Sequence, residues 1–119
     1  GAGGYREVMV AMDITDERFE AEVIEKSSKV TGVVDLWAPW GGPCKTLGPI
    51  IEKVIDATGG KVILAKVNID ENPAIGQAFK VQSIPAVYAL KDGAVVNGFT
   101  GALPEHEIQA FVDALLPSE

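Results

Sequence analysis

The sequence contains one thiol, Cys44, and one histidine, His106. A cysteine thiolate is a nucleophile and a metal ligand, but a single cysteine cannot form a disulfide within its own chain. The simpler interpretation of Cys44 is an inert buried thiol, and the alternative is a working nucleophile. His106 falls in the first turn of a predicted helix, where we expect a solvated surface residue. Because no His, Cys and Asp cluster has metal-site spacing, we expect neither a metal nor another cofactor.

Hydrophobic patterning predicts the elements that must position Cys44. Short apolar runs predict strands at residues 8–14, 31–37, 62–69, 86–90 and 95–100. Helical spacing and capping signals predict helices at 15–26, 72–79 and 104–116. They also predict a longer helix between the loop at 39–43 and the glycines at 59–60. Pro49 should kink the long helix. This order predicts an α/β fold with a central mixed sheet flanked by helices, because strands joined by helices run parallel and the last hairpin is antiparallel.

Length, charge and hydropathy limit the classes of function. A chain of 119 residues suits one domain, which we place at residues 5–119, and we interpret residues 1–4 as an expression scar. The net charge of -7 repels phosphate and argues against nucleic acid as a partner. Charged residues interrupt every apolar run, so we expect no contact with a membrane. One free cysteine suits a reducing compartment, and we expect a cytoplasmic location.

The segment Trp37-Ala38-Pro39-Trp40-Gly41-Gly42-Pro43-Cys44-Lys45 resembles the thioredoxin active site, whose pattern is Trp-Ala-x-Trp-Cys-Gly-Pro-Cys-Lys. One position of this core differs, because Gly41 stands where the first cysteine belongs. Residues 66–73, the cis-proline loop at 83–87 and the groove glycine in 99–101 resemble further family stretches. The resemblance covers nearly the whole chain and implies a thioredoxin fold.

The resemblance also implies roles for individual residues. In the family, the first cysteine attacks a substrate disulfide and the second resolves the mixed disulfide. Gly41 is the lost nucleophile position and Cys44 the resolving position, so the dithiol cycle cannot close. Asp35 matches a buried family carboxylate that helps to move protons for the resolving cysteine, and Lys66 matches a lysine near that carboxylate. A partly buried ion pair between Asp35 and Lys66 is an equal alternative to a proton relay. We expect a buried Asp35 with a raised pKa.

The family's substrate groove is implied as well. It would hold an unfolded or extended polypeptide against a cis-proline loop, and Trp40 would form its aromatic rim. The remaining peptide-binding positions are Gly42, Pro43, Ile84, Pro85, Gly101 and Ala102.

Three functions follow as hypotheses. The first is a polypeptide-binding, chaperone-associated module without dithiol–disulfide turnover. Residues 79–105, which end in Asn-Gly-Phe-x-Gly-x-x-Pro-Glu, resemble the thioredoxin domain of YbbN-like (chaperedoxin) proteins. Those proteins continue into a C-terminal helical repeat domain, so the chain could be an excised domain with that repeat as a partner. The alternative is a thioredoxin, a protein-disulfide reductase of cell redox homeostasis, with its first cysteine replaced by Gly41. The third is a monothiol enzyme that uses Cys44 with an outside thiol such as glutathione.

Overall fold

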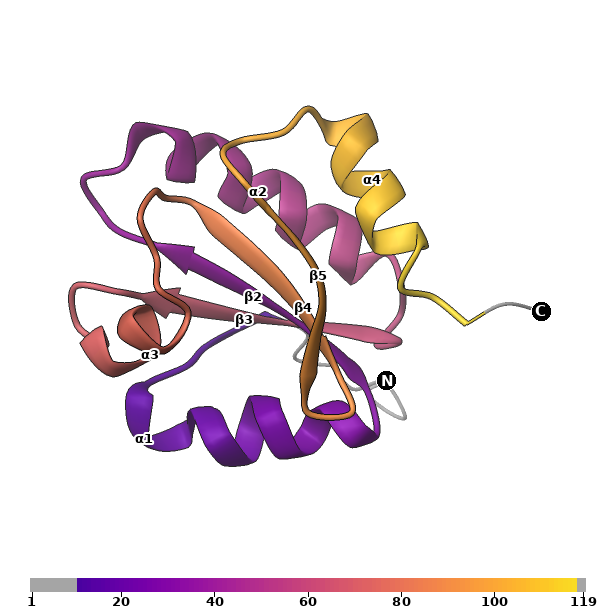
Figure 1. Cartoon of the computed structure of the whole chain (residues 1–119). Helices are drawn as coiled ribbons and strands as arrows, with labels where there is room; N and C mark the ends of the chain where they lie inside the picture. The colour runs from indigo at the N-terminus through magenta and orange to yellow at the C-terminus, as the bar shows by residue number, and fades with distance from the viewer. Residues whose placement is uncertain (1–10, 118–119) are drawn as a thin grey trace, which may run out of the picture.

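A computed structural model describes residues 11–117, which form one five-stranded sheet with helices on both faces (Figure 1). In spatial order β1-β3-β2-β4-β5, the strands are β1 (Ala11–Asp13), β3 (Val62–Asn68), β2 (Thr31–Trp37), β4 (Ala86–Lys91) and β5 (Ala94–Thr100). The first three are parallel, and β4 and β5 add antiparallel pairings. The predicted α/β fold with a mixed sheet is therefore confirmed. Residues 8–10 of the first predicted strand lie outside the described residues.

The helices divide between the two faces of the sheet. Figure 1 shows α2 (Gly42–Asp56) and α4 (Glu105–Asp113) on one side, and α1 (Asp16–Phe19) and α3 (Pro73–Ala78) on the other. Each face has its own apolar core, one between the sheet and α2 with α4, the other between the sheet and the α1 and α3 side. Within residues 11–117, no helix has the length and apolar character needed to cross a bilayer.

Strand β2 is covered on both faces, as its apolar run predicts. Side chains alternate along a strand, so Val33 packs in the core with α2 and α4 while Val34 and Leu36 pack in the opposite core. Asp35 shares the face of Val33 and therefore lies beneath α2. The alternation thus places a carboxylate where an apolar side chain would otherwise be expected.

Helix α2 begins earlier than predicted. We expected residues 39–43 to form a loop, but Gly41 is the N-cap and the helix starts at Gly42. Pro43 explains the difference, because proline suits the first helical turn, where an N–H has no helical partner. The helix continues through Pro49 and ends at Asp56, just before Gly59 and its positive φ of 66°.

The predicted helix at 15–26 is not uniform. After α1 the chain forms a π-helical segment η1 (Glu20–Glu25) and a 3-10 turn η2 (Lys26–Ser28). A π-helix brings residues five apart onto one face. Phe19 and Ile24, which have this spacing, both pack against the core on that side. The last helix is also shorter than predicted, since α4 ends at Asp113 rather than near residue 116.

Two loops have backbone geometries that the sequence predicted. The Ile84–Pro85 peptide bond is cis, which confirms the prediction from the resemblance. The predicted tight turn between β4 and β5 is formed by Asp92 and Gly93, whose φ angles are 52° and 79°. Two consecutive residues with positive φ are the geometry that a two-residue hairpin prefers.

Candidate functional site

Gly41 sits at the N-terminus of α2 with an extended backbone, φ −85° and ψ 110°. A Cβ atom built on Gly41 would lie 2.8 Å from Cδ1 of Ile84 and 2.9 Å from Sγ of Cys44. These two side-chain ends therefore fill the space that a cysteine at position 41 would use. Because both are side-chain atoms rather than backbone, a larger residue at position 41 requires only that they shift.

Cys44 lies in the first turn of α2, and its side chain is next to Gly41. Its side chain is buried, with 8% of the residue exposed, and its N–H donates to the carbonyl of Gly41 at 3.2 Å. Burial raises the pKa of the Cys44 thiol, and the nearby Asp35 carboxyl adds to this rise. The thiol is therefore protonated more readily than an exposed cysteine, which disfavours nucleophilic attack.

Asp35 is buried, as predicted, with 2% of the residue exposed. Its Oδ1 atom is buried and accepts no hydrogen bond from the described residues. Desolvation raises the pKa of the Asp35 carboxyl from 3.8 to about 6, although the Lys66 ammonium partly opposes the rise. Glu52 acts in the same direction as desolvation, because a second carboxylate disfavours ionisation of the first.

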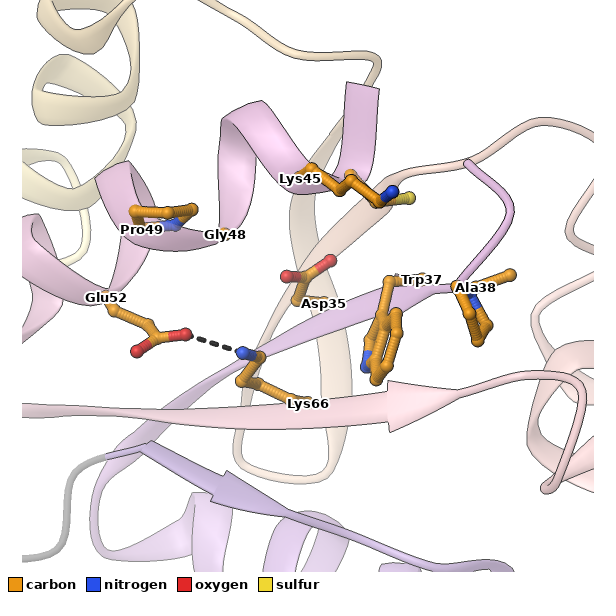
Figure 2. A pocket seen from close by; sticks show the side chains of 10 residues that line it. Asp35, Trp37, Ala38, Lys45, Gly48, Pro49, Glu52 and Lys66 are labelled. Carbon is orange, nitrogen blue, oxygen red and sulfur yellow. Dashed lines mark hydrogen bonds and ion pairs between the residues drawn. The ribbon is translucent and has the colours of Figure 1, made fainter. Parts of the chain in front are cut away.

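Lys66 does not form an ion pair with Asp35, which was one of the two alternatives for these residues. Its Nζ donates instead to Oε2 of Glu52 at 2.5 Å, an interaction drawn in Figure 2. Strand β3 carries Lys66 directly beside Asp35 in register, but the ammonium reaches across to α2. Sequence reasoning missed Glu52. A signal was present, because Glu52 follows Cys44 by eight residues and residues at i and i+8 lie on one helical face.

The predicted groove residues come from three separate segments. Ile84 is half-buried and lies close to Gly41, as the short distance to a Cβ built there shows. Gly101 has a positive φ of 85°, and its N–H donates to the carbonyl of Pro85 at 2.8 Å. The tertiary structure thus joins the start of α2, the cis-proline loop and the end of β5. The remaining groove positions are exposed, namely Gly42, Pro43 and Ala102.

Trp40 stands at the end of the loop before α2, and 68% of it is exposed. Its Nε1 donates to Oδ2 of Asp70 at 3.0 Å. This hydrogen bond orients an otherwise free indole ring and leaves its surface open to solvent. Asp70 is a second residue that sequence reasoning did not assign to the site, although it belongs to the family stretch at 66–73.

Comparison with known proteins decides the family. The model of the thioredoxin family matches residues 10–114. The chain belongs to the thioredoxin family. It is 43% identical to the thioredoxin of Chlorobaculum thiosulfatiphilum over 101 residues, which cover 85% of this chain and 92% of that protein. It is 44% identical to thioredoxin 2 of Chlorobaculum tepidum over 101 residues, covering 85% and 91%. It is 38% identical to thioredoxin 1 of Synechococcus elongatus over 104 residues, covering 87% and 95%.

These relatives favour one of the hypotheses. They carry the name thioredoxin, which fits a thioredoxin with a changed position 41 better than a chaperone-associated module. The YbbN-like subtype rests on residues 79–105 alone and stays a prediction, as does a helical repeat domain as partner. The monothiol hypothesis is weakened by the burial of Cys44 and by the raised pKa of its thiol.

The described residues supply one thiol, Cys44, and it is buried. We expect iodoacetamide to modify Cys44 in the folded chain at least about 10-fold more slowly than in urea at the same pH, because burial and protonation both suppress the thiolate. Mass spectrometry at timed intervals measures both rates.

The matched control for Cys44 is an exposed thiol in the same helical turn. Gly42→Cys in a Cys44→Ser background provides it, because a Cβ at Gly42 meets no atom within 4 Å. This control thiol should react at a rate close to that of the unfolded chain. If native Cys44 reacts as fast as the control, the description of an inert buried thiol is wrong.

Proposed function

We propose that this chain is a thioredoxin that retains the substrate groove but does not complete the dithiol–disulfide cycle. The observation that carries this proposal is the packing at position 41. Ile84 and Cys44 fill the space beside the glycine, so the sulfur nearest to this position is the buried Cys44 thiol, whose pKa is raised by burial. Reductase turnover needs a first thiolate to attack and a second to resolve, and the sequence contains one cysteine.

The groove supports a role in binding extended polypeptide. Ile84 offers a half-buried apolar contact, and Trp40 offers an exposed aromatic surface whose indole N–H is already held by Asp70. An aromatic ring that is both exposed and oriented loses little conformational freedom when it contacts a partner. The protein would therefore recognise substrates of a thioredoxin without reducing them. A cytoplasmic location remains a prediction.

We expect weak binding of reduced and carboxymethylated α-lactalbumin, an unfolded protein without disulfides. The dissociation constant should be on the order of micromolar or weaker, because ordering an unfolded segment offsets much of the contact energy. Chemical-shift mapping by NMR measures it. Perturbed amides should centre on Trp40, Gly42, Ile84 and Gly101.

Two aspartate substitutions separate this groove from other apolar surface. Ile84→Asp should weaken binding at least about 10-fold, because it places a charge in the apolar contact. Val95→Asp is the control, since Val95 is a 51% exposed residue on β5 and lies outside the groove. Shifts confined to β5, or equal binding by the Ile84→Asp variant, would show that the groove does not bind polypeptide.

A further inference from the structure

A cleft of about 550 Å³ lies between α2 and the strands β2 and β3. It falls in the size range of about 300–1,000 Å³ that is common for small-molecule pockets. Cys44 lies at the point where the cleft and the peptide groove meet, and none of the other groove residues lines the cleft. Figure 2 shows lining side chains that include Asp35, Trp37, Pro49, Glu52 and Lys66. Pro39 also lines the cleft.

Two residues that line this cleft each carry a buried polar atom without a hydrogen-bond partner among the described residues. These atoms are Oδ1 of Asp35, an acceptor, and Nε1 of Trp37, a donor. The two residues are separated by one position on β2, so both side chains stand on the sheet face that α2 covers. A buried polar atom without a partner costs about 1–3 kcal/mol, and such atoms usually find a partner in the protein, water or a ligand.

The neighbouring charges cannot supply the missing partners. Lys66 is the register partner of Asp35 on the neighbouring strand β3, but its Nζ forms a salt bridge with Oε2 of Glu52 at 2.5 Å. The lining carries two carboxylates, Asp35 and Glu52, and two ammonium groups, Lys45 and Lys66. With all four ionised, the cleft has no net charge and favours neither an anion nor a cation. The apolar walls formed by Pro39 and Pro49 favour a neutral ligand that is partly apolar.

We propose that this cleft binds a small neutral carboxamide, whose N–H donates to Oδ1 of Asp35 and whose carbonyl accepts from Nε1 of Trp37. An amide carries one donor and one acceptor side by side, which matches the two unpaired atoms in number and in kind. The apolar part of the ligand packs between the proline walls. This proposal does not depend on the proposed function, because it uses neither reduction of disulfides nor the peptide groove.

Benzamide and acetophenone test the proposal as a matched pair of probes. The two are nearly the same size, and both carry a carbonyl, but only benzamide has an N–H. Benzamide should bind with a dissociation constant of about a millimolar, which is typical for so small a ligand. Acetophenone should bind at least about 10-fold more weakly, because it leaves the buried carboxylate unpaired. Two-dimensional NMR should show the Trp37 indole N–H signal moving as benzamide is added.

Variants of the full chain identify the two contacts. Asp35→Ala and Trp37→Phe should each weaken benzamide binding about 10-fold, because each removes one hydrogen bond to the ligand. Trp40→Phe is the control for the second variant, since Trp40 is the other tryptophan and does not line the cleft. If Trp37→Phe fails to fold, Asp35→Ala still tests the site. Equal binding of both probes, shifts at Ile84 instead of the cleft, or no shift up to the solubility limit would overturn the proposal and leave a cleft that holds only water.

Discussion

The variant Gly41→Cys should reduce insulin disulfides, with a thioredoxin reductase and NADPH, at least about 100-fold faster than the unmodified chain. We expect the unmodified chain to give turnover no faster than the assay without protein. The reason is that Gly41 matches the attacking position of the family motif and is the N-cap of α2, where the helix dipole favours a thiolate. The new thiol would have Cys44 within the same helical turn to resolve the mixed disulfide.

The packing around position 41 limits how fully activity returns. A Cβ atom there would lie 2.8 Å from Cδ1 of Ile84, so this side chain must move. We therefore expect Gly41→Cys combined with Ile84→Val to be faster than Gly41→Cys alone, because the smaller side chain lacks that methyl group. Steady-state rates of the two variants, measured under the same conditions, provide the comparison.

Two controls isolate the thiol chemistry. Gly41→Ser adds a side chain of similar size without sulfur and should stay inactive. Gly41→Cys with Cys44→Ser retains the attacking thiol but not the resolving one, and it should form a mixed disulfide that does not turn over. Turnover by the unmodified chain close to that of an intact thioredoxin would contradict the proposed function.

The unfolding free energy should fall by about 3 kcal/mol through Asp35 alone as the pH rises from below 4 to above 6. Burial raises the pKa of the Asp35 carboxyl from 3.8 to about 6 in the folded chain. Between these two values the folded state binds more protons than the unfolded state. The contribution is therefore fully present below pH 3.8 and is lost as the pH rises through 6. Urea denaturation across this range measures it.

Substitution of Asp35 should remove this pH dependence. At pH 8 we expect Asp35→Asn to be more stable than the unmodified chain by about 1–3 kcal/mol, because a neutral amide costs less to bury than a carboxylate. At pH 4 the difference should be small. Asp56→Asn is the control, since Asp56 is an exposed residue at the end of α2, and it should leave the pH dependence unchanged. A loss of stability in Asp35→Asn at pH 8 would refute this account of Asp35.

Local patterns in the sequence were enough to predict most elements. The apolar run of β2, the helical spacing in α2 and the Asp92-Gly93 turn each depend on nearby residues, so periodicity and turn chemistry reveal them. Boundaries were less certain. The π-helical segment after α1 was not predicted, because packing of Phe19 and Ile24 against the sheet, rather than helix propensity, favours it.

Read alone, the sequence shows one thiol and a glycine, Gly41, at the position that matches the first cysteine of the motif. Which side chains fill the space beside Gly41, and which charged groups pair, depends on the tertiary structure. Ile84 reaches Gly41 from a loop distant in sequence, and Lys66 binds Glu52 on α2 rather than its strand neighbour Asp35. The physical reason is that side-chain partners depend on how the helix docks on the sheet. That docking leaves Oδ1 of Asp35 buried and without a hydrogen-bond partner among residues 11–117, a condition that periodicity cannot reveal.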